Sequence, residues 1–270
     1  MIGFKGEMKR MFIIGGYVVF AVFVVYGGLF FFQDKLLFRP NRDYIPPQKA
    51  AYPQFKEVSL GKGQYGWLYE GKKDAPTILY FHCNSGQNSD FAVFMEPYLN
   101  KKWTVLMVEY PGYGKAQGHP GEKKMVYNGL RAYDFLEKMG KKEIVLHGFS
   151  IGTGVALAVA ERKKPKMIVL EGAFYSIKSL AKRKYPFPGV TMLLKNPFYS
   201  YKRIEKIEVP LMMVHGTEDQ IVPYKHGVAL YEKSVSKDKT FVRLEGARHA
   251  VSRYGSLDEI VPWIEKRWYK

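Results

Sequence analysis

Cysteine is almost absent from this chain of 270 residues, which contains only Cys83. A single thiol excludes an internal disulfide framework, although it does not by itself place the protein in a reducing compartment. Acidic residues are also few relative to basic ones: 25 Asp and Glu stand against 42 Lys and Arg, so the formal net charge is +17. The chain has no internal repeats and no low-complexity tract.

The excess of basic residues admits three kinds of partner: nucleic acid, an anionic membrane surface or acidic substrates. Nucleic-acid binding lacks support, because the sequence has no zinc-finger spacing, no RNP-like aromatic motif and no basic heptad array. We therefore expect no nucleic-acid partner. Hydrophobic residues make up 47% of the chain, which is enough for a sizeable core in one large domain.

One long hydrophobic run lies near the N-terminus. Residues 11–32 are 22 consecutive residues without a charge, and a helix of that length measures about 33 Å, enough to cross a hydrocarbon core of about 30 Å. A cleavable signal peptide would have a shorter apolar core and a small-residue cleavage site, which the following sequence does not offer. We therefore expect a retained single-pass transmembrane anchor, with a buried core helix as the alternative.

The anchor divides the chain into four expected segments: an N-terminal tail at 1–10, the anchor at 11–32, a proline-containing linker at 33–54 and one domain at 55–270. The side of the membrane on which this domain lies is not specified. Basic residues flank the anchor almost equally on both sides, whereas the positive-inside rule depends on an asymmetry between the flanks.

Short apolar runs alternate with longer amphipathic runs after the linker. Several of the apolar runs lack polar alternation, which is typical of parallel strands that helices cover on both faces. The alternation predicts an α/β fold with a mostly parallel, doubly wound sheet. Strands are expected at 55–60, 65–70, 77–82, 103–110, 143–147, 166–171, 210–215 and 240–245, and helices near 87–99, 121–139, 151–163, 224–235 and 256–268.

The stretch GFSIGTG at 148–154 places Ser150 between glycines, after an apolar strand and before an amphipathic helix. A G-x-S-x-G match alone is weak evidence. The strand–turn–helix context is that of a nucleophile elbow, in which a sharp turn exposes the serine hydroxyl above the sheet. A phosphate-binding loop would need a lysine after the glycines, and a dinucleotide fold would need G-x-G-x-x-G near the first strand; neither is present.

A serine nucleophile needs a general base and an acid that orients the base. Asp219 in HGTEDQIVP and His249 in LEGARHA each follow a predicted strand, at the sheet edge where Ser150 should emerge. The order Ser150, Asp219, His249 is the order of an α/β-hydrolase triad. Glu171, which also ends a strand, remains the alternative acid.

Acyl transfer also needs two N–H groups that bind the oxyanion. The backbone N–H of Ile151, directly after the serine, is one candidate. The second is the backbone N–H of Asn84, in the loop HCNSGQN that follows the strand at 77–82. This chemistry requires no metal and no cofactor, and we expect none.

Residues 173–208 interrupt the alternation of strands and helices with a basic, aromatic segment. A short cap over the site is one interpretation, in which basic and aromatic residues rest against substrate or anionic headgroups. A solvated loop and helix is the alternative. The candidate cap residues are Lys182, Arg183, Lys184, Phe187 and Phe198.

The motifs FHCNSGQN, EYPGYGKAQG, GFSIGTG, HGTEDQIVP and GARH together resemble a branch of the α/β-hydrolase superfamily. That branch holds membrane-anchored serine hydrolases related to the yeast bud-emergence-suppressor protein. The resemblance covers about residues 36–265 and implies an esterase directed at lipids or acyl groups. Members of this branch include lysophospholipid hydrolases and depalmitoylating thioesterases.

Three positions depart from the pattern of that branch. Cys83 stands where a glycine is usual, so it would be strained if the position required a positive φ. Ala116 stands where serine is usual, and Glu109 where aspartate is usual. Cys83 is also an alternative nucleophile, although the elbow and the base belong to Ser150.

The sequence therefore predicts a membrane-anchored serine hydrolase that acts on carboxylic esters of lipids or lysolipids, with membrane lipids as its partners. The alternatives are an acyl-protein thioesterase, which cleaves fatty-acyl thioesters, and a serine peptidase. A non-catalytic membrane scaffold is the alternative from a different class.

Overall fold

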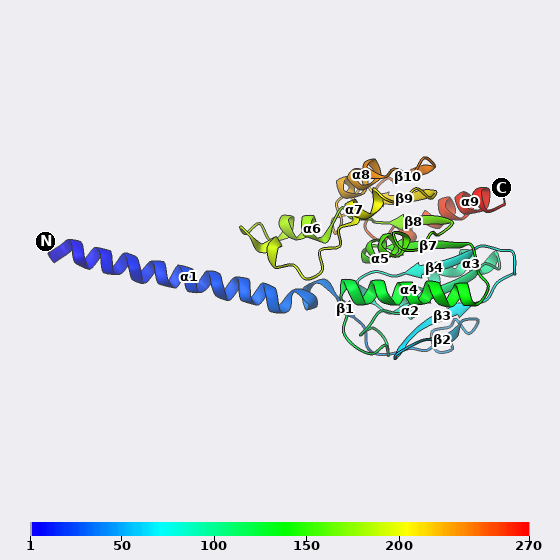
Figure 1. Cartoon of the computed structure of the whole chain (residues 1–270), viewed down its shortest axis with the longest axis horizontal. Coiled ribbons are helices and arrows are strands. Elements are labelled where there is room, and N and C mark those ends of the chain that lie inside the picture. The colour runs from blue at the N-terminus through cyan, green and yellow to red at the C-terminus, as the bar shows by residue number, and fades with distance from the viewer. Residues whose placement is uncertain (1, 270) are drawn as a thin grey trace.

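The computed structural model describes residues 2–269, with side chains from Arg10 to Tyr269. A long helix, α1 (Ile2–Leu37), projects from an α/β domain, and the chain's C-terminus lies on the far side of that domain (Figure 1). Between Arg10 and Leu37 the helix is long and apolar enough to cross a membrane, and its apolar 18-residue window is not buried inside the protein. Met1 and Lys270, which fall in the predicted tail and domain, lie outside the described residues.

The domain is built on an eight-stranded sheet in the order β10-β9-β8-β7-β4-β6-β3-β2. All neighbouring strands are parallel except β2 with β3 and β3 with β6, which are antiparallel. The predicted α/β fold with a mostly parallel sheet is confirmed, and the predicted strands are found within two residues of their expected bounds. The strands are β2 (Lys56–Gly61), β3 (Gln64–Tyr69), β4 (Thr77–Phe81), β6 (Thr104–Val108), β7 (Ile144–Phe149), β8 (Met167–Glu171), β9 (Leu211–Gly216) and β10 (Lys239–Leu244).

The parallel register brings the carboxyl ends of the central strands to one edge. Phe81 at the end of β4 lies opposite Gly148 of β7, and Phe149 at the end of β7 lies opposite Glu171 at the end of β8. Gly216 at the end of β9 lies opposite Leu244 at the end of β10. Loops that follow these strands therefore meet at the same edge, where ligands bind in open α/β sheets.

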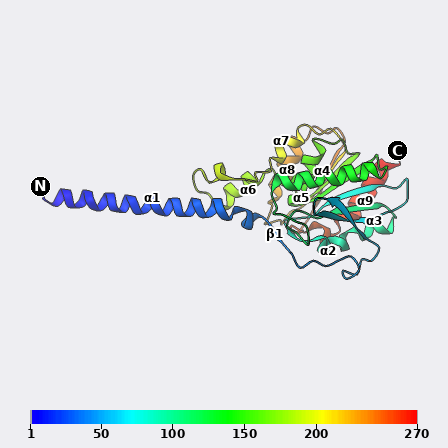
Figure 2. The ribbon, with the colours of Figure 1, turned by 60° about the horizontal axis from the view of Figure 1, so that its bottom comes forward.

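Helices cover both faces of the sheet (Figures 1 and 2). The side chains of α4 (Glu122–Lys138), α5 (Ile151–Ala160) and α8 (Tyr224–Lys233) belong to one buried cluster. Those of α2 (Asn88–Phe91), α3 (Glu96–Asn100) and α9 (Ser256–Trp268) belong to the other. The single helix predicted near 87–99 is divided into α2, a 3₁₀ turn and α3, with a proline in the first turn of α3, where the missing N–H is tolerated.

The helix α1 extends beyond the predicted run of residues 11–32, because the residues that flank the run also favour helix. Pro40 is the first proline in the chain, and nothing before it interrupts the helical hydrogen bonds. The expected linker at 33–54 contacts the domain directly after Leu37. Its strand β1 (Arg39–Pro40) pairs in parallel with β5 (Ser85–Gly86), a contact that the sequence pattern did not predict.

The segment at 173–208 contains α6 (Ile177–Lys184), a 3₁₀ turn (Val190–Leu193) and α7 (Ser200–Ile204). Both views of the ribbon place α6 beside the C-terminal part of α1, outside the sheet (Figures 1 and 2). We call residues 173–208 the cap from here on.

Gly152 allows the first turn of α5 to pack against the end of β4. A methyl group at this position would lie 2.0 Å from the carbonyl oxygen of Phe81. We expect Gly152→Ala to lower the melting temperature of the detergent-solubilised protein by several degrees, because overpacking costs about 1–3 kcal/mol. Gly121→Ala is the matched control, since its methyl group would meet only Asn196 Oδ1, at 3.5 Å. Equal melting temperatures for the two variants would contradict the close contact.

Candidate active site

Ser150 forms a sharp turn between β7 and α5. Its backbone has φ 55° and ψ −118°, a conformation that a residue with a side chain rarely adopts. Three hydrogen bonds hold this turn: Ser150 N–H donates to Glu171 O at 2.9 Å, and the backbone N–H and the Oγ1 hydroxyl of Thr153 donate to Ser150 O at 2.9 Å and 2.6 Å. The strained turn and its support are those of a nucleophile elbow.

The structure brings together the three residues of the predicted triad. Ser150 Oγ lies 2.8 Å from His249 Nε2, and His249 Nδ1 lies 2.6 Å from Asp219 Oδ2. Ser150 is 6% exposed and Asp219 is 5% exposed. With the proton on Nδ1 facing the carboxylate, Nε2 is free to accept the serine proton, as a general base must.

The Asp219 carboxylate is held as an anion by its neighbours. Burial alone would raise the pKa of Asp219, but the contacts with His215 and His249, together with the Val222 N–H, outweigh burial and hold the pKa well below its usual range. Oδ1 accepts hydrogen bonds from the N–H groups of Ile221 at 2.9 Å and Val222 at 2.8 Å. An ionised, rigid carboxylate can orient the imidazole of His249.

Neither alternative residue contacts the base. Glu171 is buried with His147, whose Nε2 lies 2.8 Å from Glu171 Oε2, and it also accepts a hydrogen bond from Ser256. The thiol of Cys83 is 3.4 Å from the hydroxyl of Ser85, and burial raises its pKa. Cys83 does not have a positive φ, so the strain that a required positive φ would cause is absent.

Four other histidines, His82, His147, His215 and His226, are buried in the domain. His82 contacts Glu109 at 3.0 Å, and His215 Nε2 donates to Val222 O at 2.8 Å. His226 of α8 is only 7% exposed, and the neighbouring Gly227 packs closely against His215 of β9. Burial lowers the pKa of His226 to about 4, and the positive charges of Lys225 and Arg183 contribute.

Asn84, the predicted oxyanion donor, lies in a loop that the end of α1 fixes in place. Its side-chain amide donates to Leu37 O at 2.6 Å, in the last turn of α1. Its carbonyl oxygen accepts hydrogen bonds from Arg39 N–H at 2.8 Å and Tyr113 O–H at 2.7 Å. Ile151, the other predicted donor, is the first residue of α5, where helical N–H groups have no partner within the helix.

The predicted cap residues fall into two groups. Lys182, Arg183 and Lys184 lie in the exposed last turn of α6, and Phe187 is 49% exposed. Phe198 is fully buried, so its assignment to a substrate- or membrane-facing surface is wrong. Its ring fills the space above Gly154 of α5, a packing contact that no local sequence pattern reveals.

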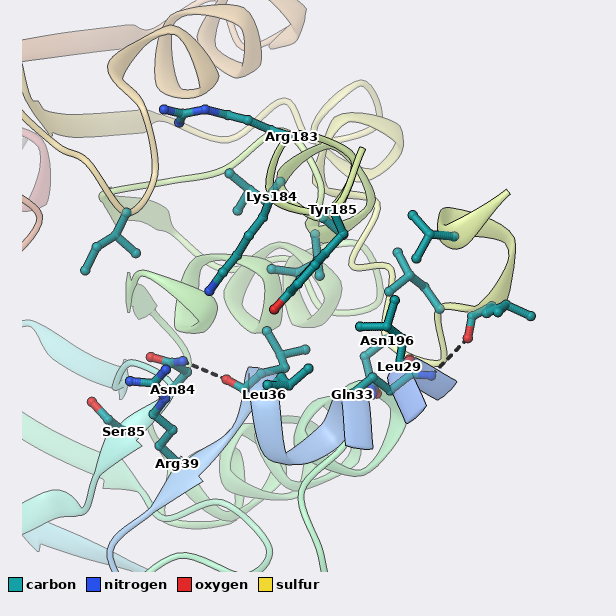
Figure 3. A pocket seen from close by; sticks show the side chains of 18 of the residues that line it. Leu29, Gln33, Leu36, Arg39, Asn84, Ser85, Arg183, Lys184, Tyr185 and Asn196 are labelled. Atoms are coloured by element: carbon teal, nitrogen blue, oxygen red, sulfur yellow. Dashed lines mark hydrogen bonds between the residues drawn. The ribbon is translucent and has the colours of Figure 1, made fainter. Parts of the chain in front are cut away.

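A pocket of about 720 Å³ lies between α1, the cap and two loops of the site. Asn84 and Ser85 line it from one loop, and Gln220 and Ile221 line it from the loop that carries Asp219. Lys184 and Tyr185 extend across it from α6 towards Leu36 on α1 (Figure 3). Ser150 and His249 are not among its lining residues, so the pocket adjoins the triad through these loops.

Among the side chains of residues 10–269, no group of three or more His, Cys, Asp and Glu is placed to hold a metal ion.

The sheet, the elbow and the triad contacts define an α/β hydrolase. A model of the α/β-hydrolase fold matches residues 76–183, and a model of serine aminopeptidases of family S33 matches residues 190–253. The chain has the α/β-hydrolase fold, and the resemblance to this superfamily that its motifs predicted is confirmed.

Three known proteins are similar to this chain over much of its length. The chain is 27% identical to protein bem46 of Schizosaccharomyces pombe over 239 residues, which cover 81% of this chain and 80% of bem46. It is 29% identical to lysophosphatidylserine lipase ABHD12 of Rattus norvegicus over 193 residues, 63% of this chain, and it spans about half of that longer protein (48%). An esterase of Pyrococcus furiosus has the same fold, with a TM-score of 0.68 and 17% identity over 87% of this chain and 98% of the esterase.

The buried His226 makes the stability of the fold depend on pH. The pKa of His226 is about 4 in the folded chain and 6.5 ordinarily, so between these values the unfolded chain binds a proton that the folded chain does not. The contribution of neutral His226 to the free energy of unfolding is therefore fully present above about pH 6.5 and decreases as the pH falls towards 4. We expect the melting temperature of His226→Gln to fall less between pH 7 and pH 5 than that of the wild type.

The control for this measurement is His119→Gln, which removes a histidine whose side chain is exposed. Its melting temperature should decrease with pH as steeply as that of the wild type. If the melting temperatures of His226→Gln and the wild type fell equally between pH 7 and pH 5, the pKa of His226 would not be lowered in the folded chain.

Proposed function

We propose that the protein is a membrane-anchored serine hydrolase that cleaves carboxylic esters of lipids or lysolipids. Ser150 is the nucleophile, His249 the general base and Asp219 the acid that orients the base. The observation that carries the proposal is the hydrogen-bond chain from Ser150 Oγ to His249 (2.8 Å) and from His249 to Asp219 (2.6 Å).

In the acylation step, Ser150 Oγ attacks the carbonyl carbon of the ester while His249 Nε2 takes the serine proton. The carbonyl oxygen becomes the oxyanion of a tetrahedral intermediate. When this intermediate collapses, the bond to the leaving alcohol breaks and the alcohol oxygen takes the proton from His249. Asp219 remains ionised and stabilises the imidazolium, a role that its lowered pKa supports.

Deacylation repeats these steps with water in place of the alcohol. Water gives a proton to His249 Nε2 as its oxygen bonds to the acyl carbon. The bond between the acyl carbon and Ser150 Oγ then breaks, and the proton returns to Oγ. The products are a carboxylic acid and the free enzyme, and the reaction as written needs neither a metal nor a redox cofactor.

The oxyanion is assigned to the N–H groups of Ile151 and Asn84. Ile151 begins α5, where the helix dipole is also positive. Asn84 depends on its neighbours for position: Leu37, Arg39 and Tyr113 hold its side chain and carbonyl group. Loss of one oxyanion donor typically lowers kcat by about 10²–10³-fold, so the loop position matters for the rate.

Three observations support a lipid ester as substrate. The helix from Arg10 to Leu37 is long and apolar enough to anchor the domain at a bilayer. The pocket beside the site combines apolar side chains with the cations Arg39, Arg183 and Lys184. A relative that matches 63% of this chain is named a lysophosphatidylserine lipase, and this name describes a lipid substrate.

The same triad could serve the alternatives that the sequence left open. A fatty-acyl thioester on a protein would form the same acyl-enzyme, and the serine aminopeptidase model at residues 190–253 keeps a peptide substrate as a second alternative. A non-catalytic scaffold would have no need for the strained φ of 55° at Ser150 or for its alignment with His249.

The proposal predicts an activated serine that a fluorophosphonate probe labels covalently. We expect the purified wild type and Cys83→Ala to be labelled and Ser150→Ala not to be labelled. Hydrolysis of a lysolipid by Ser150→Ala should fall by at least about 10⁴-fold in kcat, because the members of a triad act as a unit. Absence of labelling in folded wild-type protein would favour the scaffold alternative.

A substrate panel then separates the remaining classes. Palmitoyl lysolipids, palmitoyl-thioester peptides and aminopeptidase substrates are compared at equal concentrations of probe-labelled sites. The proposal expects the lysolipid esters to have the highest kcat/KM. A higher value for the thioester peptide would assign the enzyme to the acyl-protein thioesterases.

A further inference from the structure

We propose that the C-terminal part of α1 forms one wall of the acyl-chain site, so that a lipid substrate reaches Ser150 laterally from the bilayer. The anchor would then be part of the substrate-binding machinery as well as an attachment. This inference rests on the proposed function, since it concerns the acyl group that Ser150 would cleave.

The pocket beside the site takes its apolar lining from two elements. Leu29, Leu36 and Leu37 contribute from α1, and the apolar side of the cap lies opposite them. Figure 3 shows Leu29, Gln33 and Leu36 on the helix and Lys184 and Tyr185 reaching towards it from α6. The residues that the cap contributes to the apolar lining are Ile177, Leu180, Ala181, Val190, Leu193 and Leu194.

A second, apolar hollow continues this lining along α1 towards the N-terminus. It has a volume of about 490 Å³, and Leu193 of the cap lines both hollows. Its α1 residues recur at the spacing of one helical face: Val18, Val19, Val22, Phe23, Tyr26, Gly27 and Phe30. From Val18 to Leu36 this face runs about 27 Å, the scale of a long acyl chain.

Several hydrogen bonds fix α1 against the cap, so the wall is part of the packed structure. Gln33 Nε2 donates to Leu193 O at 3.0 Å, and Gln33 Oε1 accepts from Lys195 N–H at 2.7 Å. Asn196 Nδ2 donates to Asp34 Oδ1 at 2.7 Å, and the hydroxyl of Tyr26 donates to Pro188 O. Gln33 and Asp34 thus satisfy polar groups at the point where an apolar helix meets the domain.

The polarity of the pocket gives the ligand a direction. Arg39, Arg183 and Lys184 line the pocket, and no acidic residue does so among the described lining residues. Arg39 lies beside Asn84 and Ser85, at the end of the pocket nearest the candidate oxyanion loop (Figure 3). The apolar end leads to the part of α1 that would lie in the membrane. An amphiphile with a polar group, an ester and one long acyl chain matches this order.

The site should therefore select for chain length. Burial of each additional methylene against the wall is worth about fourfold in affinity. Leu29→Trp narrows the pocket from the side of α1, and Leu193→Trp narrows it from the side of the cap. Phe31→Trp is the matched control, because Phe31 is 73% exposed on α1 and lines neither hollow.

The measurement is the ratio of kcat/KM for 1-palmitoyl lysolipid to kcat/KM for a butyryl ester. It is made on the full chain in vesicles, per fluorophosphonate-labelled site, so that misfolded protein does not contribute. We expect both Leu29→Trp and Leu193→Trp to lower this ratio at least tenfold and Phe31→Trp to keep it within about twofold of the wild type.

An unchanged ratio in both pocket variants would overturn the inference while leaving the serine hydrolase intact. An equal decrease in Phe31→Trp would also overturn it, because the effect would then come from the membrane helix in general. Failure of the wild type to cleave either ester would instead contradict the proposed function. The two pocket variants lie on different elements, so one of them suffices if the other does not fold.

Discussion

The contact between the last turn of α1 and the loop of Asn84 is the constraint that joins the N-terminal helix to the candidate site. The amide of Asn84 donates to Leu37 O at 2.6 Å, and the strand β1 that follows the helix pairs with β5 directly after this loop. Because this loop carries a proposed oxyanion donor, the end of α1 lies next to one of the two groups proposed to bind the reacting carbonyl. The end of α1 and the candidate site are thus held together by direct contacts.

The rest of the chemistry follows from the parallel sheet. Strands β4, β7, β9 and β10 end at one edge, so residues far apart in the sequence meet there with short loops. The strain at Ser150 is sustained because Glu171 and Thr153 hold both of its backbone polar groups. The buried, ionised Asp219 then orients His249. The cap lies opposite α1 and lines the pocket beside the site.

Much of this could be predicted from the sequence, because the relevant signals are local. Apolar runs marked the strands, and Ser150, Asp219 and His249 each follow one of them in the order that the fold uses. The missed features depend on tertiary packing. Phe198 lies in a basic, aromatic segment but fills the space above Gly154 of α5, and His226 is buried although it lies on the amphipathic helix α8. Likewise, no local pattern reveals that the linker pairs with the loop of Asn84 or that α1 lines a pocket.

The most direct test of the account is to locate the acyl chain of a bound substrate. Ser150→Ala protein in vesicles would be photolabelled with a lysolipid that carries a diazirine in its acyl chain, and the labelled residues would be mapped by mass spectrometry. The account predicts labelling at Leu29 and Leu193 that excess unlabelled lysolipid suppresses, and labelling at Phe31, on the exposed side of α1, that it does not suppress. Suppressible labelling confined to residues outside α1 would contradict it.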